Sequence, residues 1–178
     1  MCDESLRRLN KFSSSVRASS MTEPRCCLRT TDFELSLQLS KRRLVQEGWA
    51  EVELKLTGLR PDEFTLQVTT TSYSPIQDWE QLSRRCESFQ SKSGEWEFVD
   101  GDLACLISCS FDIDEDDGTD EHSDAHEVSL DVRLRSGEWS RRVYPGIESR
   151  IEAAVLIDFA RQIKEFCNTL RSLDSVKN

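Results

Sequence analysis

Strict alternation of apolar and polar residues in separate segments is the feature that most constrains how this chain can fold. Apolar side chains occupy every second position from Phe33 to Leu39, from Val52 to Leu56 and from Val128 to Leu134. A period of two sends alternate side chains to opposite faces of a β-strand, one buried and one wet. Strands with one wet face favour antiparallel pairing over a parallel sheet that is covered on both sides. The sequence therefore predicts an antiparallel sheet that contains these segments.

Two further patterns extend the predicted sheet. Apolar residues also alternate from Phe64 to Val68, which predicts a third strand early in the chain. Alternation from Trp96 to Phe98 and from Leu103 to Phe111 flanks the dipeptide Asp100-Gly101. Because Asp-Gly suits the two left-handed positions of a tight turn, we expect a two-residue hairpin there.

The period changes from two to about 3.6 in two places, which predicts two helices. The sequence Ser74-Pro75-Ile76-Gln77 is typical of a helix start, and an apolar stripe continues from it to Phe89. A second amphipathic stripe runs from Val155 to Leu170. Strands and helices in this order indicate an α+β fold, a mostly antiparallel sheet of about seven strands with two amphipathic helices packed on it.

Length and charge divide the chain into a single domain and two tails. At 178 residues, the chain has the length of one domain. We expect residues 1–25 to form a disordered basic tail, with Met21 a candidate for the natural start of translation. Residues 26–173 form the expected α+β domain, and residues 174–178 a disordered C-terminus.

A concentrated run of carboxylates interrupts the later part of the predicted sheet. Residues 112–127 hold nine acidic side chains, two histidines and no lysine or arginine. Placed on a loop between two strands, these charges form a candidate site for a basic partner, although such runs are often simply solvated. The candidate partner-binding residues of this loop are Asp112, Asp114, Glu115, Asp116, Asp117, Asp120 and Glu121.

Residues for catalysis or metal binding are sparse. His122 and His126 are the only histidines, and together with Asp124 they are weak candidates for metal ligands on a loop. A calcium-binding loop starting at Asp112 fails because Asp117 stands where that motif needs glycine. The sequence lacks the nucleophile-elbow and glycine-rich phosphate-binding motifs. We therefore expect no cofactor, no metal centre and no enzymatic activity.

Two of the four tryptophans are candidates for an interface. Trp49 follows Gly48, and Trp139 follows Gly137-Glu138, so both lie at predicted strand ends. Tryptophan at a strand end is often exposed, and exposed tryptophan is enriched among residues that dominate binding energy. Trp49 and Trp139 are therefore candidate partner-binding residues, with a place in the core as the alternative for each.

The order of these elements resembles a family of small bacterial proteins related to the immunity protein of the wall-associated protein A toxin. The resemblance covers Phe33 to Leu170 and rests on common structural motifs in a given order: Asp78-Trp79-Glu80-Gln81-Leu82, Phe89, Gly94-Glu95-Trp96, Asp100-Gly101, His126-Glu127-Val128, Trp139, Phe159-Ala160 and Phe166. It implies a cytoplasmic protein that neutralises a cognate toxin by binding it. The acidic run and the basic N-terminal tail depart from the family pattern.

Composition limits the remaining functions. A net charge of −10 opposes binding to nucleic acid, and no stretch is long and apolar enough to span a membrane. Seven cysteines without a C-x-x-C pair, mostly on apolar stripes, indicate a reducing cytoplasm. We expect a cytoplasmic, non-enzymatic binding protein whose partner is a basic protein such as a toxin domain. The alternative is an intracellular ligand- or metal-binding domain, and the oligomeric state is left open.

Overall fold

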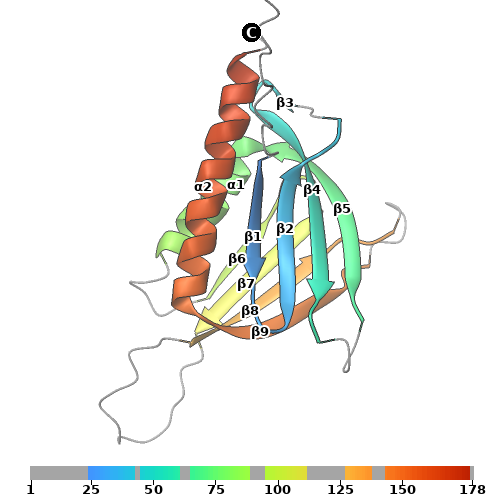
Figure 1. Cartoon of the computed structure of the whole chain (residues 1–178), viewed down its shortest axis with the longest axis vertical. Coiled ribbons are helices and arrows are strands. Elements are labelled where there is room, and N and C mark those ends of the chain that lie inside the picture. Colours follow the sequence, from blue (N-terminus) through green and yellow to red (C-terminus); the bar gives the residue numbers. More distant parts are fainter. Residues whose placement is uncertain are drawn as a thin grey trace, which may run out of the picture.

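The computed structural model describes residues 24–42, 45–60, 65–88, 95–111, 127–137 and 143–176. These residues form two helices and nine strands in two antiparallel sheets, so the predicted α+β class and antiparallel pairing are confirmed (Figure 1). The strand number exceeds the predicted seven, and the strands form two sheets rather than one. The additional strands are short, and one of them has few apolar residues, so alternation alone did not reveal them.

The first sheet, sheet A, is formed by the N-terminal half of the chain. β2 and β3 lie end to end against one side of β4, because Val52 of β4 is opposite Leu39 and Ala50 is opposite Val45. β5 pairs with the other side of β4, and β1 pairs with β2. The strands are β1 (Arg25–Arg29), β2 (Phe33–Leu39), β3 (Val45–Gln46), β4 (Trp49–Gly58) and β5 (Gln67–Pro75).

The second sheet, sheet B, is a four-stranded meander in the order β6-β7-β8-β9. It lies behind sheet A in Figure 1, with its strands crossing those of sheet A at an angle. Its members are β6 (Trp96–Val99), β7 (Cys105–Phe111), β8 (Glu127–Leu134) and β9 (Gly146–Glu152).

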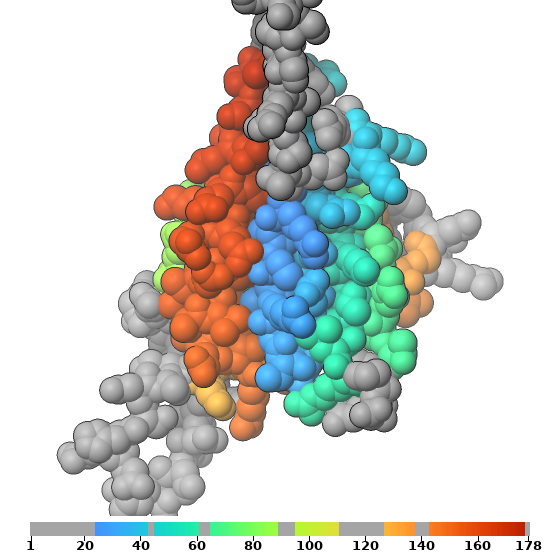
Figure 2. Space-filling view, viewed as in Figure 1, coloured from blue at the N-terminus to red at the C-terminus, as the bar shows by residue number. Residues whose placement is uncertain are grey.

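The helices α1 (Ile76–Ser88) and α2 (Ala153–Ser175) pack against each other at one side of the sheets. The Ser83 hydroxyl of α1 donates a hydrogen bond to the Ala160 carbonyl of α2 at 2.8 Å, which fixes the two helices closely together. α2 also lies beside β1 (Figure 2), where the Cys27 N–H donates to the Gln162 side chain at 2.9 Å. The predicted apolar stripes of both helices join the inward faces of both sheets in one core. Neither described helix has an apolar stretch long enough to cross a bilayer.

The boundaries of the ordered elements differ slightly from those expected. β1 begins at Arg25, and α2 continues to Ser175, two residues beyond the predicted end of the domain. The extension is held in place because the Asp174 carboxylate accepts a hydrogen bond from the Gly48 N–H at 2.9 Å. Residues 1–23, 177 and 178 lie outside the described residues.

β5 is displaced along the chain from the predicted strand. It runs from Gln67 to Pro75 rather than from Phe64 to Val68, and Phe64 lies outside the described residues. The inward positions near its end are Ser72 and Ser74, both fully buried. Their hydroxyls bond to each other at 3.0 Å, which is why small polar residues are tolerated at core positions.

The hairpin between β6 and β7 is confirmed, but its turn differs from the one predicted. The connection spans 100–104, and the described residue with positive φ is Leu103 rather than Asp100 or Gly101. The two-residue turn with both positions left-handed is found instead at Glu47-Gly48, between β3 and β4, with φ of 52° and 79°.

Candidate protein-binding surface

The predicted acidic loop leaves sheet B from two neighbouring strands. Phe111, at the end of β7, is opposite Val128 near the start of β8, so the two ends of the loop are held side by side. Its last residue, Glu127, is exposed and begins β8. The other candidates lie outside the described residues: Asp112, Asp114, Glu115, Asp116, Asp117, Asp120, Glu121, His122, Asp124, His126 and Trp139.

Carboxylates also occur on the outer face of sheet B, among the residues that the structure describes. Alternation along β8 buries Val128, Leu130 and Val132, and therefore turns Glu127 and Asp131 outward. The same alternation on β6 and β9 turns three more glutamates to this side. Arg133 of β8 and Arg150 of β9 also point to this side, so its carboxylates outnumber its cations. We call this surface the acidic face and define it by Glu97, Glu127, Asp131, Glu148 and Glu152.

The acidic face contains two pairs of like charges in directly opposed positions. Glu127 is opposite Glu152, and Asp131 is opposite Glu148, on the adjacent strands β8 and β9. Like charges directly across an antiparallel pair are destabilising. The register therefore places carboxylates where sheet stability alone would favour a neutral or oppositely charged partner.

Neighbouring side chains partly offset the repulsion between Asp131 and Glu148. Arg133 donates hydrogen bonds from its guanidinium to Asp131 at 2.7 Å, and this interaction raises the pKa of Arg133. The Ser129 hydroxyl donates to Glu148 at 2.7 Å. Each of the two carboxylates therefore has a hydrogen-bond donor fixed beside it.

Two adjoining depressions lie along sheet B, one on its outer side and one at its β9 edge. One, of about 530 Å³, is lined by Glu97, Ser108 and Asp131, and it shares Ser129 and Glu148 with its neighbour. The other, of about 490 Å³, is lined by charged residues of both signs, namely Asp32, Arg60 and Arg150, and by Ser149. Asp32 is held by an ion pair with Arg60 and a hydrogen bond from the Ser149 hydroxyl. The acidic depression suits a cationic group, and the second a ligand with mixed charge.

Trp49, predicted as an interface residue, is 40% exposed on the outer side of sheet A. Its ring stacks on Tyr73, which is 42% exposed, with 5.4 Å between the ring centroids. Sequence reasoning missed Tyr73 because it lies in a polar stretch of β5, which has no apolar alternation at that point. The pair forms an exposed aromatic surface separate from the acidic face.

The cysteines of the described chain are free thiols, and five of the six are buried. Burial raises the pKa of Cys109 and of Cys167 to about 12, and it also raises the pKa of Cys26, Cys86 and Cys105. Such thiols are protonated at neutral pH and are poor nucleophiles. Among the residues that the structure describes, no group of three or more His, Cys, Asp or Glu side chains could hold a metal ion.

No protein family, curated protein or solved structure matches this chain in the comparisons. The fold and the acidic face therefore carry the functional argument, and the resemblance to immunity proteins stays a hypothesis.

Proposed function

We propose that this protein binds a basic protein partner through the acidic face of sheet B together with the acidic loop at 112–127. The observation that carries the proposal is the direct opposition of Glu127 to Glu152 and of Asp131 to Glu148. A sheet optimised only for stability would not place carboxylates opposite each other twice on the same pair of strands. A binding role accounts for this arrangement, because complementary charge on a partner would relieve the repulsion.

The expected contribution of this surface is to the rate and specificity of association. A surface with an excess of negative charge attracts a positively charged partner and raises the association rate, an effect that salt screens. The two ends of the loop are adjacent, and one of them, Glu127, is itself part of the acidic face. Five of the six described cysteines are buried and therefore contribute to the core.

A finer form of the proposal is that the partner is a toxin domain and that the protein is a cytoplasmic immunity protein. Its support is the resemblance described above and the acidic face, which would fit over a basic active-site cleft. In the alternative, the protein is an intracellular ligand-binding domain. The depression that contains Arg60 and Arg150 favours this alternative, because its mixed charge suits a small zwitterionic ligand.

The test compares two double variants against the purified product of the gene immediately upstream. Glu127→Gln with Glu148→Gln removes one carboxylate from each opposed pair, and the amide oxygen at 148 can still accept the Ser129 hydroxyl. The control, Glu87→Gln with Glu165→Gln, removes the same charge from exposed positions on α1 and α2.

The association rate should fall severalfold in the acidic-face variant and much less in the control. The wild-type rate should also fall more steeply with added salt than that of the acidic-face variant. Equal salt slopes for the three proteins would refute the role of the acidic face. Failure of the upstream product to bind would refute the immunity proposal as stated.

A further inference from the structure

The aromatic surface of sheet A has a carboxylate at its edge. Trp49 and Glu51 are two residues apart on β4 and therefore point to the same outer side, and Tyr73 of β5 is directly opposite Glu51. Within the part of the chain that the structure describes, the Glu51 carboxylate makes no hydrogen bond or ion pair. Two exposed rings and an available carboxylate thus share one small area, which we call the aromatic platform and define by Trp49, Glu51 and Tyr73.

The platform is held rigidly by bonds from both helices. The Glu47-Gly48 turn immediately before Trp49 is fixed by two bonds of Gly48, whose N–H donates to the Asp174 carboxylate of α2 at 2.9 Å. The Gly48 carbonyl accepts a hydrogen bond from the Ile76 N–H at the start of α1, at 2.8 Å. Because the backbone turn is clamped and the Trp49 ring stacks on Tyr73, the ring needs little ordering when a ligand binds, which favours affinity.

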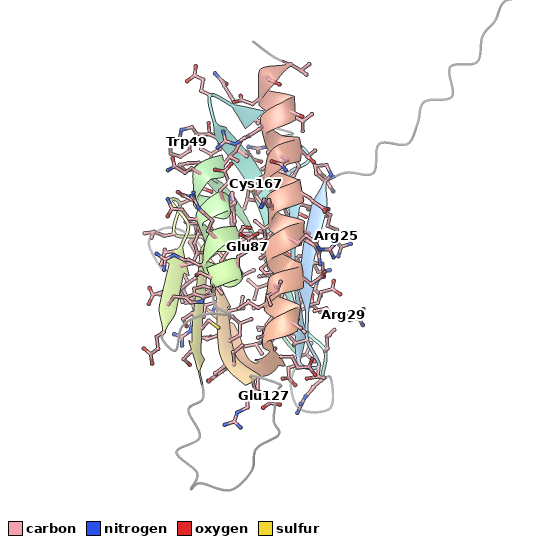
Figure 3. The ribbon with its side chains drawn as sticks, turned by 90° about the vertical axis from the view of Figure 1, so that its left-hand side faces the viewer. Arg25, Arg29, Trp49, Glu87, Glu127 and Cys167 are labelled. Atoms are coloured by element: carbon pink, nitrogen blue, oxygen red, sulfur yellow. The ribbon has the colours of Figure 1, made fainter. Side chains whose placement is uncertain are left out.

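The platform is distinct from the acidic face. Figure 3 shows Trp49 near one end of the long axis of the molecule and Glu127, in the acidic face, near the other. A ligand of the platform is therefore recognised by the platform's own chemistry. That chemistry consists of the negative faces of two aromatic rings and the charge of one carboxylate.

We propose that the aromatic platform binds the guanidinium group of an arginine side chain from a protein partner. A guanidinium is planar and weakly hydrated, so it stacks on the exposed ring faces of Trp49 and Tyr73 while donating hydrogen bonds to Glu51. A lysine ammonium satisfies the charge but cannot stack as a plane. An uncharged ligand of the same shape loses both the attraction to the rings and the ion pair.

This proposal rests on the proposed function in one respect only: the arginine is supplied by the basic protein partner. It adds the aromatic platform to the acidic face as a second site of contact with that partner. Its test uses the full chain and small probes, so it is independent of the acidic face and of any partner protein. The probes are N-acetyl-arginine methylamide, its lysine analogue and its citrulline analogue, which has nearly the shape of arginine without the charge. Binding is followed by NMR through the indole N–H of Trp49 and through the backbone N–H of Tyr73, and the second signal also serves the Trp49→Leu variant.

We expect saturable shifts of the Trp49 signal with the arginine probe, weaker binding of lysine, and citrulline affinity lower by about fivefold or more. Glu51→Gln should weaken arginine binding about two- to fivefold, because an exposed ion pair contributes modestly. Trp49→Leu should weaken it by a similar factor by removing one ring. Glu165→Gln, which removes a carboxylate from α2, should leave it unchanged.

Equal binding of arginine and citrulline to the wild-type protein would overturn the proposal, and this comparison does not depend on any variant folding. Unchanged arginine affinity in both Glu51→Gln and Trp49→Leu would also overturn it. Loss of the salt effect at the acidic face would leave these results untouched, so the two proposals can fail separately.

Discussion

The buried carboxylate of Asp100 should be one of the strongest single determinants of stability in this fold. Its side chain is 1% exposed at the start of the β6–β7 connection. One oxygen accepts hydrogen bonds from the backbone N–H groups of Ala104 and Cys105, at 2.8 and 2.6 Å. The other accepts the N–H of Asp102 at 3.3 Å and the hydroxyl of Ser72 from β5. The carboxylate therefore closes the hairpin and ties it to sheet A.

Replacing Asp100 with alanine removes four hydrogen bonds, three of which have buried donors. A buried donor without an acceptor costs about 1–3 kcal/mol, and the buried N–H groups of Ala104 and Cys105 have the shortest bonds to lose. With partial relaxation of the loop, we expect the free energy of unfolding to fall by about 3–5 kcal/mol. Asp100→Asn keeps an oxygen for these two groups, so its loss should be about 1–2 kcal/mol.

Urea denaturation, followed by tryptophan fluorescence, measures both losses. A change of 3–5 kcal/mol is a large part of the roughly 5–15 kcal/mol that stabilises a typical domain, so Asp100→Ala should shift the midpoint strongly. A loss below about 1 kcal/mol in Asp100→Ala would show that the loop finds other acceptors. If the alanine and asparagine variants lost the same free energy of unfolding, the hydrogen bonds from Ala104 and Cys105 to the side-chain oxygen at position 100 would not be what stabilises the hairpin.

Two other perturbations test the core and the same connection. Because burial raises the pKa of Cys109 and Cys167 from 9.0 to about 12, the folded state disfavours the thiolate. These thiols should thus leave the free energy of unfolding unaffected below pH 9 and lower it as the pH rises from 9 towards 12. Urea midpoints that stay constant over this range would contradict the prediction. Leu103 has a φ of 53° and is 42% exposed, so Leu103→Gly should relieve backbone strain and raise the free energy of unfolding by up to about 1 kcal/mol in the same assay. A decrease would show that the leucine side chain packs more strongly than its exposure suggests.

The elements with clear apolar periodicity were predictable from the sequence. The strands from Phe33 to Leu39 and from Val128 to Leu134, and the buried stripes of both helices, follow the pattern directly. The inward face of β5 did not follow it, because Ser72 and Ser74 are stabilised in the core by hydrogen bonding that reaches Asp100. That acceptor belongs to Asp100, 28 positions from Ser72, so a short-range sequence pattern cannot predict it.

The candidate site was predictable only in part, for a related reason. The run of acidic residues and the exposure of Trp49 follow from local sequence. The opposition of Glu127 to Glu152 depends on the register of β8 against β9, two strands separated by a loop. Tyr73 likewise gains significance only from its place opposite Glu51 on β4. Long-range pairing, rather than composition, therefore defines both surfaces.

The acidic face should show opposite effects of the same substitutions on stability and on binding. Each opposed pair of carboxylates costs about 0.2–1 kcal/mol relative to a neutral pair, so Glu127→Gln with Glu148→Gln should raise the free energy of unfolding by about 0.4–2 kcal/mol at low salt. The gain should shrink as salt is added, because screening already weakens the repulsion in the wild-type protein. Urea denaturation at two salt concentrations measures this change.

If the acidic face were present for stability, its removal would lower the free energy of unfolding. If the carboxylates contributed net structural bonds, the double variant would be less stable than the wild-type protein, and the Glu87→Gln with Glu165→Gln control would be the more stable of the two variants. A double variant that is more stable and yet associates more slowly with its basic partner is expected only where charge is retained for recognition at the expense of the sheet. A less stable double variant would instead assign Glu127 and Glu148 to the structure of sheet B, and the binding surface would then have to be sought at the aromatic platform.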